Sequence, residues 1–74
     1  MEEKPLHIGS VIRETMKEQG RSASWLAKQL HCTRENVYRI YAREWIQTDM
    51  LLRISLVLEV NFFLCYAEYL QNRL

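Results

Sequence analysis

The sequence predicts a single all-α domain, folded as a compact five-helix bundle with a helix-turn-helix. Of its 74 residues, 49% are hydrophobic, which is enough for a dense core. Only two glycines and one proline occur, fewer than a protein with many tight β-turns requires. Apolar residues also recur at three- and four-residue spacing, the period of amphipathic helices. One domain spanning residues 1–74 is therefore expected.

The first helix is predicted over about residues 7–19. Before it, residues 1–6 (MEEKPL) form a polar lead-in, expected to be flexible, in which Pro5 opposes helix formation. The apolar positions of the helix are Ile8, Val11, Ile12 and Met16. Gly20 follows directly and suits the left-handed residue that often ends a helix.

Two short helices are predicted next, over about 23–30 and 34–42. Ser22 is preferred to Ser24 as the N-cap of the first, and Thr33 caps the second. The inward positions are Trp25, Leu26, Leu30, Val37 and Ile40, with Tyr41 as a further candidate. Helices this short are marginal alone, so tertiary packing must support them.

The last two helices are predicted over about 49–59 and 62–72. Thr48 is the expected cap of the first and Asn61 that of the second, with residues 44–47 as a loop. The core face of the first is Leu51, Ile54, Ser55 and Leu58. The second is apolar on more than one side, beyond what a single buried face needs.

Residues 23–42 fit a helix-turn-helix, in which two short helices meet at a three-residue turn. Ala27 is small where the second helix would cross the first, and Cys32 is a small apolar residue inside the turn. Leu26, Leu30, Val37 and Ile40 supply the core anchors at suitable offsets.

On these residues the chain resembles the lambda-repressor-like, or XRE-type, helix-turn-helix proteins. The resemblance covers about residues 8–60, through IGSVIRETMKEQG, SASWLAKQLHCTRENVYRI and TDMLLRISLVL. The run from CTRENVYRIYARE to IQTDMLLRISLVLEVNFF is similar to short members common in Bacteroides-type bacteria. The resemblance implies that the helix at 34–42 enters the DNA major groove and that the helix before it crosses the backbone. His31 stands where the family often has glycine, and histidine tolerates the left-handed conformation at some cost.

The resemblance implies two sets of DNA contacts. The base-reading residues would be Arg34, Glu35, Tyr38 and Arg39. The phosphate-binding residues would be Arg21, Ser22, Lys28, Asn36 and Arg43. Arginine can pair with guanine and glutamate can accept from cytosine, while Asn36 could meet either a phosphate or an adenine edge. Each of these residues could instead be an ordinary surface residue, and the Tyr38 ring could pack on the flank of its own helix.

The charge distribution agrees with DNA binding, although the whole chain carries only +1. Residues 21–43 carry +4, whereas residues 1–20 carry −1 and residues 44–74 carry −2. A concentrated basic patch can bind phosphate even on a nearly neutral chain. We therefore expect a transcriptional regulator that binds double-stranded DNA.

A homodimer is also expected, because one small module buries little surface on DNA. The candidate dimer residues are Phe62, Phe63, Tyr66, Tyr69 and Leu70, which could alternatively belong to the core. The alternative function is a protein-interaction module, antitoxin-like or adaptor-like, that docks a partner through this C-terminal helix without binding DNA.

Other function classes lack a signature in the sequence. We expect no enzyme activity, cofactor or small-molecule substrate, since no catalytic motif or glycine-rich phosphate loop occurs. No metal is expected, because His31 and Cys32 are adjacent but His7 and Cys65 are distant. Cys32 and Cys65 are expected to be reduced and buried, with an inter-helix disulfide as the alternative. A cytoplasmic protein is expected, because neither a signal peptide nor an apolar membrane span is evident.

Overall fold

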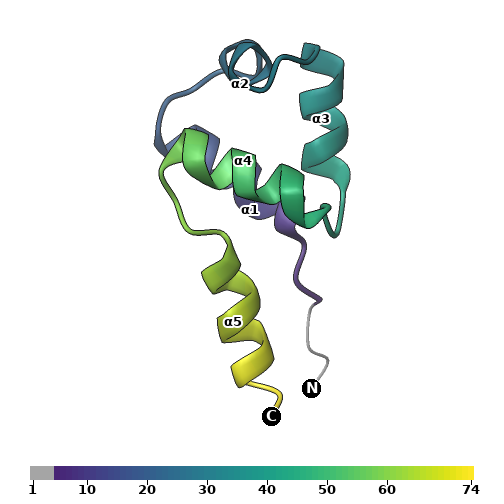
Figure 1. Cartoon of the computed structure of the whole chain (residues 1–74), viewed down its shortest axis with the longest axis vertical. Helices are drawn as coiled ribbons and strands as arrows, with labels where there is room; N and C mark the ends of the chain where they lie inside the picture. The colour runs from purple at the N-terminus through teal and green to yellow at the C-terminus, as the bar shows by residue number, and fades with distance from the viewer. Residues whose placement is uncertain (1–4) are drawn as a thin grey trace.

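Five helices form the regular structure of residues 5–74, the part of the chain that the computed structural model describes (Figure 1). The helices are α1 (Ile8–Glu18), α2 (Ala23–Leu30), α3 (Arg34–Ala42), α4 (Thr48–Leu58) and α5 (Phe63–Gln71). The all-α prediction is confirmed, and each boundary lies within one residue of the expected one. Residues 1–4 of the expected lead-in lie outside the described residues, and Pro5 to His7 have no regular structure.

Side-chain caps begin the first three helices. The Ser22 hydroxyl accepts a hydrogen bond from the Trp25 amide at 3.1 Å, and the Thr33 hydroxyl accepts from the Asn36 amide at 3.2 Å. Both caps were predicted, as was the left-handed Gly20, whose φ is 67°. His7 adds an unpredicted cap, because its Nδ1 accepts from the Ser10 amide at 3.1 Å.

The ends of α4 and α5 differ from the prediction. Thr48 is already helical, Gln47 precedes α4 as its N-cap, and no side-chain hydrogen bond caps this helix. At the other end, the left-handed Glu59, with a φ of 56°, stops α4 one residue early. Asn61 does satisfy the start of α5, because its Oδ1 accepts from the Phe63 amide at 3.1 Å.

The core contains the predicted apolar face of each of the first four helices. The buried hydrophobic residues are Ile8, Ile12, Met16, Leu26, Ala27, Leu30, Val37, Ile40, Ile46, Leu51, Ile54, Leu58 and Phe62. Val11, Trp25, Tyr41 and Ser55 are only partly buried. Both cysteines are free but half-buried, so the expectation of full burial was wrong.

Ile46 and Phe62 are buried outside the predicted helix faces. Ile46, a loop residue, was not predicted to be in the core. Phe62 is 0% exposed, so it lies in the core, the alternative left open for it, and not on a dimer surface. It lies just before α5, where the turn after Asn61 directs its ring inward. Burying a phenylalanine side chain contributes about 1.5–3 kcal/mol, so Phe62 ties α5 to the rest of the fold.

A close approach of backbones joins the start of α1 to the end of α3. The Ile8 amide donates to the Glu44 carbonyl at 3.1 Å, and the Gly9 amide donates to the Arg43 carbonyl at 3.0 Å. A Cβ atom at Gly9 would collide with the carbonyl oxygens of Ile40, Tyr41 and Arg43. Only glycine therefore permits this contact, which satisfies two of the free amides at the α1 N-terminus.

The helix α5 differs from the others because it contributes no buried residue. Figure 1 shows it leaving the end of α4 and pointing away from the remaining helices. The described residues have a radius of gyration of 12.6 Å and principal extents of 38 × 22 × 21 Å. The core thus lies among the first four helices, and α5 adds length to the molecule.

Candidate nucleic-acid interface

The connection between α2 and α3 determines the orientation of α3 relative to α2. His31 is left-handed, with φ 56° and ψ 46°, as the comparison with glycine at this position implied. The His31 amide donates to the Lys28 carbonyl at 3.3 Å, and the Cys32 amide donates to the Ala27 carbonyl at 2.9 Å. These bonds satisfy the last carbonyls of α2 and turn the chain into α3 within three residues.

The inner side of α3 is fixed by packing and its outer side is open. Val37 and Ile40 are buried, and α3 packs against both α1 and α2. All four predicted base-reading residues are exposed, namely Arg34, Glu35, Tyr38 and Arg39. In a helix, residues four apart share a face, so Glu35 lies beside Arg39 and Arg34 beside Tyr38. The structure therefore brings the four residues together on one exposed surface.

Tyr38 also contacts its own helix. Its ring meets the Tyr41 ring edge-on, with centroids 6.0 Å apart and an interplanar angle of 75°. The side chain nevertheless remains 55% exposed. It occupies the flank of α3 that borders α1, where Arg13, Tyr38, Tyr41 and Ala42 line a shallow hollow. This arrangement favours the packing alternative for Tyr38.

Tyr41 is held in its neutral form at this flank. Partial burial raises the pKa of the Tyr41 hydroxyl, the neighbouring Tyr38 adds to the rise, and Arg13 opposes it. Tyr41 therefore contributes packing rather than charge to this side of α3.

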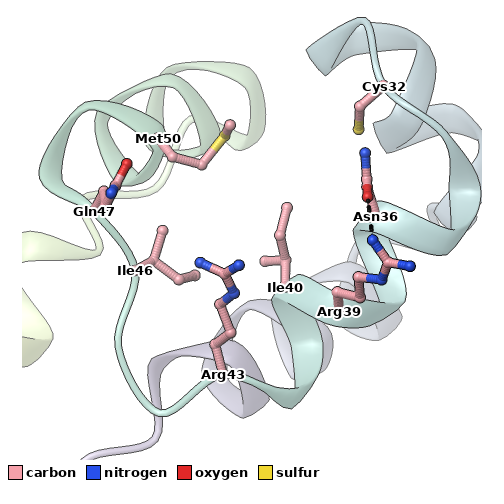
Figure 2. Close-up of a pocket in the computed structure, with 8 residues that line it drawn as sticks. All are labelled: Cys32, Asn36, Arg39, Ile40, Arg43, Ile46, Gln47 and Met50. Carbon is pink, nitrogen blue, oxygen red and sulfur yellow. Dashed lines mark hydrogen bonds between the residues drawn. The ribbon is translucent and has the colours of Figure 1, made fainter.

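The other flank of α3 borders a hollow of about 270 Å³, between α3 and the start of α4 (Figure 2). Its apolar lining residues are Cys32, Ile40, Ile46 and Met50, and its polar lining residues are Asn36, Arg39, Arg43 and Gln47. The Arg39 guanidinium donates to Asn36 Oδ1 at 3.4 Å. Figure 2 shows the Arg43 guanidinium between the Ile40 and Ile46 side chains.

Three predicted site residues, Asn36, Arg39 and Arg43, thus meet at this hollow, which we call the α3–α4 hollow. Gln47 joins them and was missed by the sequence reading. Gln47 is the N-cap of α4. The prediction gave that role to Thr48 and left Gln47 in a loop, so Gln47 was not considered as a site residue.

The predicted phosphate contacts on α2 and just before it are not among the residues that line the α3–α4 hollow. The Arg21 guanidinium stacks over the Trp25 ring, 4.0 Å from its centroid, which restricts the side chain near the start of α2. Lys28 is exposed on α2. Ser22 already accepts the capping hydrogen bond, so its hydroxyl has one less lone pair for another donor but can still donate to a phosphate.

Two further observations concern other kinds of site. Among residues 5–74, no three His, Cys, Asp or Glu side chains gather in a way that could hold a metal ion. Within the same residues, no single helix is long and apolar enough to cross a membrane. Helices α4 and α5 have sufficient length and apolar composition only when they are taken together, and the chain bends by 115° between them.

Comparison with known proteins finds no protein-family model, no curated protein and no solved structure that matches the chain. The function must therefore be inferred from α2, α3 and the α3–α4 hollow themselves.

Proposed function

We propose that this protein binds double-stranded DNA by placing α3 in the major groove, as a transcriptional regulator of the lambda-repressor-like helix-turn-helix type. The observation that carries the proposal is the division of α3 into two sides. Arginines lie on its exposed outer side, and Val37 and Ile40 anchor its inner side in the core. The major groove is about 12 Å wide and admits an α-helix. The three-residue turn and the order of the five helices support this class of fold.

The exposed residues of α3 divide by their chemistry. Arg34 and Arg39 carry the paired donors that match O6 and N7 of guanine. Glu35 accepts from the amino group of cytosine and is repelled by phosphates, so it favours a correctly placed base over non-specific binding. The hydrogen bond from Arg39 to Asn36 restricts the guanidinium and reduces the entropy lost on binding.

The phosphate contacts would flank this surface on both sides. Arg43, which lines the α3–α4 hollow, would meet one strand. Arg21 and Lys28, on the α2 side, would meet the backbone where α2 crosses it. The +4 charge of residues 21–43 would displace counterions and make the affinity depend on salt.

The test is a salt titration of binding to a random-sequence duplex, measured by fluorescence anisotropy. The variant Arg34→Ala/Arg39→Ala is compared with the wild type and with Lys17→Ala/Arg73→Ala. The control pair removes the same charge from α1 and from the far end of the chain. We expect the wild-type log–log slope to be several units. The α3 variant, which loses two cations from the surface that would face DNA, should lose more affinity than the control variant.

Sequence specificity is tested by selecting a preferred duplex and repeating the measurement. Arg39→Ala should then cost about 1–3 kcal/mol at one base pair, whereas Lys28→Ala should weaken all sequences alike. If the wild type shows no binding at low salt, or if the control variant loses as much affinity as the α3 variant, the proposal is wrong.

A second function is favoured by a separate observation, the apolar surface of α5. This helix buries no residue, and Leu64 and Leu70 are more than half exposed on it. A protein-interaction module of antitoxin-like or adaptor type would use this surface. A protein of this second kind would keep its biological function in the variant Arg34→Ala/Arg39→Ala and lose it when Phe63 and Tyr66 are replaced. The DNA-binding proposal expects instead that Arg34→Ala/Arg39→Ala is inactive.

A further inference from the structure

We propose that the α3–α4 hollow binds a small amphipathic anion, namely a carboxylate attached to a compact apolar group such as a single ring, and that this ligand competes with DNA. The competition rests on the proposed function, because the ligand takes guanidinium groups that are assigned to DNA contacts. Binding of the anion itself does not depend on DNA. The ligand is an effector that acts by occupying the hollow.

The polar part of the hollow carries two positive charges that no carboxylate of residues 5–74 neutralises. Within these residues neither Arg39 nor Arg43 forms an ion pair, and the hydrogen bond that the Arg39 guanidinium makes is to Asn36 Oδ1. The Gln47 side chain also lines the hollow and makes no capping hydrogen bond to α4. A carboxylate placed here would receive charge-assisted hydrogen bonds, which are roughly twice as strong as neutral ones.

The rest of the lining is apolar. Ile40 and Ile46 are each 8% exposed, so they present core surface to the hollow. Cys32 and Met50 line it as well and are half-buried. Because the Arg43 guanidinium lies between the Ile40 and Ile46 side chains (Figure 2), one of the two charges is placed beside apolar groups. A hydrogen bond to an ionised group is stronger in such surroundings than in water.

The size and the chemistry of the hollow together select the class of ligand. Its volume of about 270 Å³ is just below the range of about 300–1,000 Å³ that holds drug-sized molecules, so the ligand is small. A phosphate group would use the arginines but would leave the apolar lining uncovered. A neutral apolar molecule would cover that lining but would take the guanidinium groups out of water without a partner. An aromatic carboxylate satisfies both parts, and its two oxygens match the paired donors of arginine.

Occupation of the hollow would oppose DNA binding through Arg39 and Arg43. The first is a proposed base contact and the second a proposed phosphate contact. A guanidinium that holds a carboxylate cannot offer the same donors to guanine, and the negative charge of the ligand repels the phosphates. An exclusive competitor present at about ten times its own Kd raises the apparent Kd for DNA about tenfold.

The first test is a titration of benzoate into the isotope-labelled full chain without DNA, followed by amide NMR spectra. A ligand of this size should bind with a Kd on the order of 1 mM. Benzamide, which keeps the ring without the charge, and acetate, which keeps the charge without the ring, should each bind at least about tenfold more weakly. The largest shifts should lie at the amides of the hollow, namely Cys32, Asn36, Arg43, Gln47 and Met50.

Two matched variants locate the site. Arg43→Gln should raise the Kd for benzoate about tenfold, because it removes a charged hydrogen-bond donor. Arg13→Gln removes a guanidinium from the shallow hollow on the other flank of α3 and should leave the Kd unchanged. Both side chains are exposed, and circular dichroism verifies that each variant is folded. The site is refuted if benzoate binds no better than benzamide or acetate, or if Arg13→Gln weakens binding as much as Arg43→Gln does.

The second test measures the competition by fluorescence anisotropy of a random-sequence duplex. Sodium benzoate at about ten times its Kd should raise the Kd for DNA about tenfold relative to the same concentration of sodium acetate, which matches the ionic strength. Equal DNA affinity in the two salts would overturn the competition while the benzoate site stands. If no DNA binds in acetate at low salt, the proposed function fails and the competition with it, and the titration without DNA still decides whether the hollow binds the anion.

Discussion

Replacing Gly9 by alanine should destabilise the protein, although alanine is the better helix former. In a helix interior this exchange normally gains about 1 kcal/mol. Here the new Cβ would collide with three carbonyl oxygens at the end of α3. Such overpacking costs about 1–3 kcal/mol. Moving α1 away to relieve it would break the hydrogen bonds from the Ile8 and Gly9 amides, each worth about 1 kcal/mol.

The protein incurs either the overpacking or the loss of the two hydrogen bonds, each about 2–3 kcal/mol, so after the gain in helix propensity the net loss for Gly9→Ala is about 1–2 kcal/mol. A domain of this length has a total stability of about 4–11 kcal/mol. For such a domain each kcal/mol changes Tm by about 4–8 °C, so the expected fall is about 4–16 °C.

The assay is thermal and urea unfolding followed by circular dichroism, with Gly20→Ala as the control. A Cβ at Gly20 would meet nothing within 4 Å, but its φ of 67° disfavours alanine. The control should therefore lose about 1–2 kcal/mol from backbone conformation alone. If Gly9→Ala is as stable as the wild type or more stable, the close packing of α1 against the end of α3 is refuted.

Two further predictions concern backbone conformation and pH. His31→Gly should stabilise the protein by up to about 1 kcal/mol, because glycine adopts the left-handed conformation that His31 holds without steric cost; an unchanged or lower urea midpoint would contradict this reasoning. Stability should also fall as the pH rises above about 9, because burial is the main cause that raises the pKa values of Cys65, Tyr41 and Tyr66 above their ordinary 9.0, 10.0 and 10.0. A raised pKa means that the folded state holds the proton more tightly, so the stabilisation is complete below the ordinary pKa and is lost as the pH rises through the folded value. Melting curves between pH 8 and pH 11 would show this fall, and Tyr41→Phe should reduce it; a Tm independent of pH would be inconsistent with partial burial of these hydroxyl and thiol groups.

The sequence alone determined where the first three helices lie and most of the residues that they bury. Ser22, Thr33 and Gly20 act through hydrogen bonds or backbone conformation within a few residues, so their effects are visible in the local sequence. The apolar spacing that places Val37 and Ile40 inward also places Arg34 and Arg39 outward, because a helix has a fixed period. The exposed α3 surface was predictable for this reason.

Tertiary structure decided what residues outside the helical pattern do. Phe62 and Phe63 are adjacent and equally apolar, yet one is buried and the other is partly exposed, because the turn after Asn61 orients them. Ile46 and Gln47 are similarly assigned to the core and to the α3–α4 hollow by the path of a loop. Such loops bring together residues that are distant in sequence, and their path cannot be predicted from a repeating pattern of apolar residues.

The requirement for Gly9 was also decided by tertiary structure. In the sequence it is a glycine within a helix, a residue that local propensity disfavours. Glycine is required because a Cβ atom would collide with the carbonyl oxygens of Ile40, Tyr41 and Arg43, which are more than thirty residues away in the sequence. Local sequence fixes the helices because their hydrogen bonds are local, whereas the approach of α1 to α3 depends on packing between distant segments.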